Sequence, residues 1–194
     1  MASDIDIASN ALILIGHTPI NSFEDAGAGA RVASALYEPR LLALLTDGTY
    51  WSFARKTRSL NRLSAKPIND WGFAFQLPTD MLAMERTYPR ADYQIFEEKL
   101  YTNNSEMMID YIFRPSTPDM PAYFTLLLEY KMAADFAIPV TNDVQKAQMF
   151  ARAFDMQRGV AMATDAKNSP PVSIVDSPFV NVRLGNSSFR GNIT

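Results

Sequence analysis

Cysteine is absent from this chain of 194 residues, and histidine occurs only once, as His17. The absence of thiols excludes disulfides, cysteine nucleophiles and cysteine-ligated zinc sites, and one histidine cannot form a multi-histidine metal cluster. His17 stands in Gly16–Pro19, where a first helical pattern stops, and this position favours a role at a turn or helix end over general-base catalysis. We therefore expect no enzyme, no cofactor and no metal, and an enzyme built around His17 is the alternative to test.

Motifs of phosphate binding and nucleophilic catalysis are also missing. The glycine-rich segment 27–30 lacks the Gly-Lys-Ser/Thr that completes a phosphate-binding loop, and no Gly-x-Ser-x-Gly elbow occurs anywhere in the chain. Closely spaced acidic residues suggest helix N-termini or an exposed strand more strongly than paired-carboxylate catalysis. These acidic pairs are Asp4/Asp6, Glu24/Asp25 and Glu97/Glu98.

Long apolar runs and an excess of positive charge are lacking as well. No run approaches the ~18 uncharged apolar residues of a membrane span, and the first residues lack the basic and apolar regions of a secretory signal. We expect no membrane partner and a protein that stays in the compartment where it is made. The net charge of -3 provides no general attraction to nucleic acid. With 47% hydrophobic and 20% charged residues, the chain is typical of globular proteins.

The spacing of apolar residues predicts four helices, over 4–15, 25–46, 119–138 and 143–167. Ser3 or Asp4 is suited to cap the first helix, and Glu24-Asp25 precedes the second. Pro39 removes a backbone donor, so it is expected to kink the second helix or split it in two. Pro139 is expected to end the third helix, and Thr141-Asn142-Asp143 to cap the fourth.

Between the second and third helices the pattern changes to alternation. Residues 50–54 look β-like or irregular, and the alternating runs between 71 and 114 predict a small antiparallel sheet with turns at 88–92 and 103–105. The expected fold class is α+β, mainly α, in which a helical bundle carries an inserted sheet. One domain over 1–168 followed by an extended C-terminal arm over 169–194 is the simplest division of the chain.

The arm combines prolines with scattered apolar side chains. Ordering its backbone costs ~1–2 kcal/mol per residue, whereas burying each apolar side chain returns only ~1.5–3 kcal/mol. We therefore expect the arm to be largely disordered alone and to need a neighbouring surface.

A basic stretch follows two aromatic residues, Trp51 and Phe53. Basic residues interleaved with aromatics can bind single-stranded nucleic acid by stacking and phosphate contacts, so a nucleic-acid-binding protein that uses residues 51–66 is the alternative function. The favoured interpretation is a solvated face or an inter-subunit charge face, because the first fifty residues are acidic and opposite charges within one chain suit head-to-tail association. The basic residues are Arg55, Lys56, Arg58 and Arg62, extended by Lys66.

Several short motifs occur in an order that resembles a known family. They are Ala11-Leu12 to Gly16, Pro19-Ile20, Tyr37 to Leu42, Trp51 to Ala54 with Arg58 and Leu60, Leu77 to Asp80, Tyr130 to Ala134, and Phe136 to Thr141 followed by a long helical pattern. Together they are similar to phage tail tubular protein A and related head-to-tail adaptors (connectors) of short-tailed phages. The resemblance covers most of the chain up to about residue 167, and Pro39 and the arm have no counterpart in it.

The resemblance implies a structural protein of the virion neck, assembled in the host cytoplasm as a dodecameric ring. Its partners would be other copies of itself, the portal, a nozzle similar to tail tubular protein B, and tail fibres. Genomic DNA would pass through the channel without specific binding, and no catalysis is implied. The arm would contact the portal or a neighbouring subunit, and the residues assigned to that contact are Phe179, Val180, Arg183, Leu184, Phe189 and Arg190.

Overall fold

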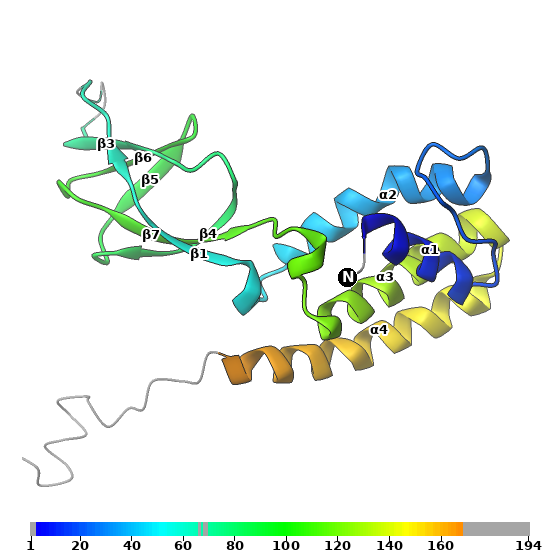
Figure 1. Cartoon of the computed structure of the whole chain (residues 1–194). Coiled ribbons are helices and arrows are strands. Elements are labelled where there is room, and N and C mark those ends of the chain that lie inside the picture. The colour runs from blue at the N-terminus through cyan, green and yellow to red at the C-terminus, as the bar shows by residue number, and fades with distance from the viewer. Residues whose placement is uncertain (1–2, 66, 68–69, 169–194) are drawn as a thin grey trace, which may run out of the picture.

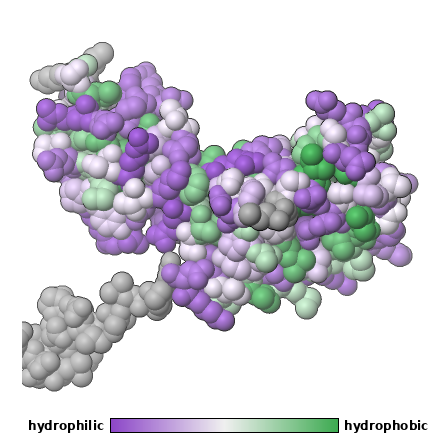
Figure 2. Space-filling model, viewed as in Figure 1, coloured by the Kyte–Doolittle hydropathy of each residue, from purple (hydrophilic) through white to green (hydrophobic). Residues whose placement is uncertain are grey.

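Four helices pack together at one end of the molecule, and small antiparallel sheets form the other end (Figures 1 and 2). The computed structural model describes residues 3–65, 67 and 70–168. We call residues 55–113 the β lobe, and residues 3–54 with 114–168 the helical lobe. The mixed α and β composition with antiparallel sheets agrees with the expected class. The helices are α1 (Asp4–Leu14), α2 (Ala28–Leu45), α3 (Ala122–Thr141) and α4 (Val144–Asp165).

The ends of α1 and α4 follow the local capping signals. Ser3 and Asp6 form a reciprocal capping box, in which each backbone N–H donates to the other residue's side chain. Gly16, with φ of +80°, follows the end of α1. Asp143 caps α4 by accepting from the Lys146 N–H at 3.0 Å. The predicted helix starts at 4 and near 143 are confirmed, and α4 passes into a 3-10 turn over Ala166–Asn168.

The predicted start of α2 is wrong, and Pro39 does not split the helix in two. The helix begins at residue 28 and not at 25, because the Asp25 carboxylate accepts from the N–H groups of Asn21 and Ser22 and so closes the preceding loop. Pro39 lies inside an unbroken helix. Both Pro39 and Ala35, whose carbonyl loses its donor, are exposed, so water can replace the missing bond.

The predicted bounds of α3 are also wrong. Thr117–Asp119 form a 3-10 turn, and the helix begins at 122. It continues through the exposed Pro139 to Thr141, and the reversal comes at Asn142, whose φ of 51° is left-handed. Asparagine tolerates this conformation better than most residues. The stop is therefore set by Asn142, and Pro139 is accommodated on the solvent side.

The strands form two sheets, and they begin earlier than predicted. The first strand starts at residue 55 and not at 71, and residues 52–54 before it form a 3-10 turn. One sheet has the order β1-β7-β4 and the other β2-β3-β6-β5, with all neighbours antiparallel. The predicted turns at 88–92 and 103–105 lie in the β4–β5 and β6–β7 connections. The strands are β1 (Arg55–Ser59), β2 (Asn61–Arg62), β3 (Phe73–Gln76), β4 (Met81–Tyr88), β5 (Tyr93–Phe96), β6 (Lys99–Thr102) and β7 (Met108–Phe113).

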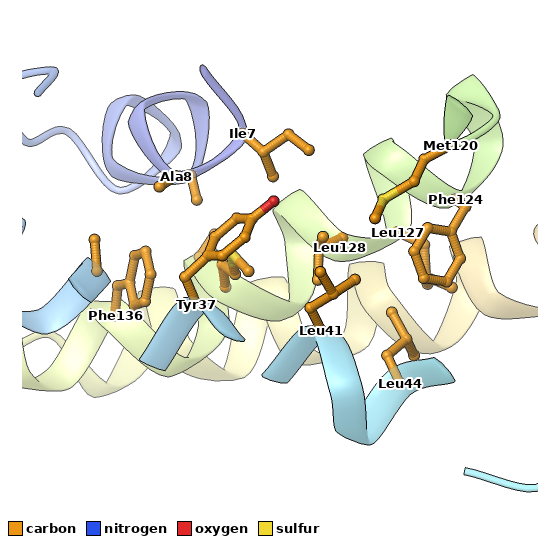
Figure 3. Close-up of a cluster of buried hydrophobic side chains, with 14 of the residues drawn as sticks. Ile7, Ala8, Tyr37, Leu41, Leu44, Met120, Phe124, Leu127, Leu128 and Phe136 are labelled. Atoms are coloured by element: carbon orange, nitrogen blue, oxygen red, sulfur yellow. The ribbon is translucent and has the colours of Figure 1, made fainter. Parts of the chain in front are cut away.

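Each lobe has its own apolar cluster. In the helical lobe, side chains of α1, α2 and α3 meet in the middle of the packed helices, among them Ile7, Leu41 and Leu128 (Figure 3). The smaller cluster of the β lobe contains residues of both sheets, including Phe75, Leu100 and Ile109. Ile112 of β7 belongs to the helical cluster, so this strand connects the two lobes.

Candidate interaction surfaces

A half-buried polar network attaches the segment after β7 to the helices. Arg114, directly after β7, donates to both oxygens of Glu38, at 2.7 and 3.0 Å, and contacts the Asp4 carboxylate. Tyr37 and Thr117 also donate to Asp4. Burial first, and then the Asp4 carboxylate, raise the pKa of the Tyr37 hydroxyl. The hydrogen bond to Glu38 raises the pKa of Arg114. This network ties the β lobe to α1 and α2.

A second network holds the end of α4 against the start of β1. The buried carboxylate of Asp165 accepts from the Ser52 N–H at 2.8 Å, the Ser52 hydroxyl at 2.7 Å and the Tyr123 hydroxyl at 2.6 Å. Burial, followed by this bond to Asp165, raises the pKa of Tyr123. The last turn of α4 is therefore held against the segment that leads into β1.

The predicted charge face is partly occupied by ion pairs within the same chain. The Arg55 guanidinium lies 2.7 Å from Glu85, and the Lys56 ammonium lies 2.8 Å from Asp80. The bond from Lys56 is the main reason that the pKa of Asp80 is lowered. Arg58 and Arg62 are exposed, and the Arg62 guanidinium lies over the Phe73 ring. Of the four residues, Arg58 and Arg62 are the best placed to meet a partner.

The acidic N-terminal region is engaged internally as well. Asp4 and Glu38 pair with Arg114, and Asp47 pairs with Arg158 of α4 at 2.8 Å. Much of the charge asymmetry seen in the sequence is therefore satisfied within one subunit. Charge alone is a weaker basis for association than the sequence suggested.

The aromatic residues before the basic stretch form part of the helical core. Trp51 is fully buried, and its indole N–H donates to the Leu44 carbonyl at 3.1 Å. Its ring packs edge-on against Phe124, which also contacts Phe53. The prediction that Trp51 and Phe53 can stack on bases is wrong, because both rings are occupied by core packing.

His17 lies in the turn after α1, as predicted. Its Nδ1 lies 3.0 Å from the Thr18 carbonyl, and its ring rests against Gly29 of α2, where an added Cβ would come within 2.8 Å of the imidazole. Within the ranges that the structure describes, no group of three histidine or acidic residues could hold a metal. Glu97 and Glu98 form the β5–β6 turn and not a paired site on a strand; their φ values are 50° and 57°.

The outer face of α4 is an apolar surface that sequence periodicity did not identify. Figure 2 shows hydrophobic side chains along the lower edge of the helical lobe, where Figure 1 places α4. We call the exposed residues Met149, Met156 and Val160, which recur at helical spacing along one side of the helix, the α4 apolar face. Met156 is 77% exposed. The predicted stripe of Val144, Ala147, Ala151 and Phe154 instead lines a shallow groove between α3 and α4. Because both sides of α4 carry apolar residues, periodicity alone could not assign the side that is exposed.

The six arm residues predicted to contact the portal or a subunit lie outside the described residues. Among the helices that are described, none is both long and apolar enough to cross a bilayer. No family model matches the chain, and no curated protein matches it.

Proposed function

We propose that this protein is a ring-forming head-to-tail adaptor of a tailed-phage particle, in which a helical bundle with an inserted β lobe joins the portal to the tail nozzle. The α4 apolar face is the observation that carries the proposal. Flexible methionine side chains gathered on an exposed helix are typical of surfaces that bind another protein. Since the chain has few other candidates for a function, association with protein partners is the best explanation of this face.

The arrangement of the two lobes supports this role. The networks around Arg114 and Asp165 attach the segments that precede β1 and follow β7 to the helices, so both ends of the β lobe are anchored to the helical lobe. Head-to-tail contacts between two different surfaces of a subunit close into a ring when the rotation between neighbours is a whole fraction of a full turn and carries no translation along the axis. In a closed ring every subunit is held by two neighbours, so many weak contacts together give a stable assembly.

Substituting the α4 apolar face should prevent ring formation. In the Met156→Asp/Val160→Asp double variant, each interface would have to bury two carboxylates, which costs several kcal/mol when no partner charge is present. We expect native mass spectrometry, with and without portal, to find oligomers of the unaltered protein and only the 21.7 kDa chain of the variant. Gln148→Asp, at an exposed position of α4 about a quarter turn away from this face, is the matched control and should leave the oligomers intact. Oligomers of unchanged mass in the double variant would contradict this role of α4.

Deleting residues 170–194 should leave a folded protein that no longer binds portal. The deletion starts beyond Asp165 and Asn168, so the polar network at the end of α4 is retained. Circular dichroism should be unchanged, and co-sedimentation with portal should be lost. Retained portal binding would show that the arm is not the portal contact.

The nucleic-acid alternative has little support from this geometry, because only Arg58 and Arg62 of its basic residues are exposed without a carboxylate partner among the described residues. A salt-sensitive shift of labelled single-stranded DNA that is lost in Arg58→Glu/Arg62→Glu would revive it.

A further inference from the structure

One edge of the β lobe is open and lies beside an apolar groove. Among the strands that the structure describes, β5 is the last of its sheet and pairs with β6 alone. The groove, of about 370 Å³, is lined by Leu77 and Met81 on one side and by Ile95, Phe96, Glu97 and Glu98 on the other. Met81 is the first residue of β4, which is the edge strand of the other sheet. The groove therefore separates two open sheet edges.

The backbone of β5 is suited to pair with one more strand. Glu97 and Glu98 form a two-residue turn, so Phe96 and Lys99 form the hydrogen-bonded pair that closes the hairpin. Because such pairs alternate along antiparallel strands, the N–H and C=O groups of Tyr93 and Ile95 point away from β6. All four β5 side chains are exposed. Such an edge is a template for strand addition.

The C-terminal segment has the pattern that this edge requires. In Phe179–Leu184, the residues Val180, Val182 and Leu184 alternate with Phe179, Asn181 and Arg183, as in a strand with one apolar face. Ile95 is opposite the fully buried Leu100, so the inward side of β5 is also apolar. Arg183 complements the carboxylates at the turn, where Glu98 is exposed and has no ion pair among the described residues.

We propose that residues 179–184 of a neighbouring copy add to the free edge of β5 and place their apolar side in this groove. A neighbouring copy is named as the donor because the proposed ring would place a second arm beside each β lobe. The arm of one subunit would thereby clamp the next. This inference rests on the proposed ring and names the surface that receives the arm.

The absence of cysteine permits a direct test in the full-length protein. Gln94→Cys and Asn181→Cys are made in separate chains, mixed, and treated with a short bis-maleimide; both positions would lie on the outer side of the added strand. We expect at least about tenfold more covalent dimer than in a matched mixture of Ser34→Cys with Asn181→Cys, because strand pairing raises the effective concentration of the two thiols. Ser34 is exposed on α2, away from the groove. Dimer at the control level overturns the proposal.

The charge complementarity and the identity of the donor chain are tested with the same assay. Glu97→Lys/Glu98→Lys should reduce cross-linking to the control level, and adding Arg183→Glu should restore it. Cross-linking that is unaffected by charge reversal contradicts the proposed contact.

A cross-link within the doubly substituted Gln94→Cys/Asn181→Cys monomer identifies the chain's own arm as the occupant and overturns the clamp. If the unaltered protein forms oligomers but the cross-link is not found, only the clamp is overturned. If native mass spectrometry finds only the monomer, with and without portal, the proposed ring is overturned as well.

Discussion

Trp51→Ala is expected to lower the free energy of unfolding by about 3–5 kcal/mol, the usual range for truncating a buried large aromatic residue. Trp51 is fully buried between α2 and α3, so the alanine would leave a cavity beside Phe124 and Phe53. It would also leave the Leu44 carbonyl without its indole donor. Denaturant unfolding followed by far-ultraviolet circular dichroism measures the loss.

The neighbouring residue provides the control. Tyr50 is 50% exposed, and Tyr50→Ala should change the free energy of unfolding by less than about 1 kcal/mol. The comparison also separates the two interpretations of residues 51–66. A core residue loses stability on truncation, whereas a base-stacking residue would leave stability unchanged and weaken DNA binding. A stable Trp51→Ala protein would contradict the core assignment.

Asp165→Ala is expected to cost about 3 kcal/mol and to loosen the end of α4. A hydrogen bond to a charged group contributes ~1.5–3 kcal/mol, and this carboxylate accepts three. Its removal leaves the Ser52 N–H and the Tyr123 hydroxyl without their acceptor. Because Ser52 directly precedes β1, hydrogen exchange should increase at both Ser52–Ala54 and the last turn of α4.

Two further variants define the cause of the Asp165 effect. Asp155 is exposed on the same helix, so Asp155→Ala should be nearly neutral. Asp165→Asn retains one acceptor oxygen and should give an intermediate loss. If Asp165→Ala were as stable as Asp155→Ala, the network would not be what holds α4 to the β lobe.

Local signals in the sequence were sufficient to predict where α1 and α4 begin. The capping box at Ser3 and the cap at Asp143 depend on residues within one helical turn, so their geometry is the same in any fold. The order of helices, strands and helices was also readable, because the hydrophobic period changes where the secondary structure changes. The lack of cysteine and the single histidine limited the chemistry before any fold was known.

Contacts between residues far apart in the sequence decided the features that local signals did not predict, namely β1, the burial of Trp51 and the continuity of α2 and α3. Arg55–Ser59 reads as a basic surface stretch, yet it is a strand because its backbone pairs with β7 some fifty residues later. Trp51 next to basic residues suggests stacking on bases, and only the packing of α2 and α3 shows that its ring is enclosed. Pro39 and Pro139 predict breaks, but tertiary packing retains both helices because each proline faces solvent.

Burial is a property of the assembled chain, and this is why the candidate surfaces could not be assigned in advance. Apolar residues occur on several sides of α4, and the choice of the side that packs on α3 determined which methionines remained outside. The groove beside β5 exists because β4 and β5, although consecutive in the sequence, are edge strands of different sheets that end next to one another. Residue types and their spacing predicted a globular fold of mixed α and β structure, whereas the packing of its lobes decided which side chains can meet a partner.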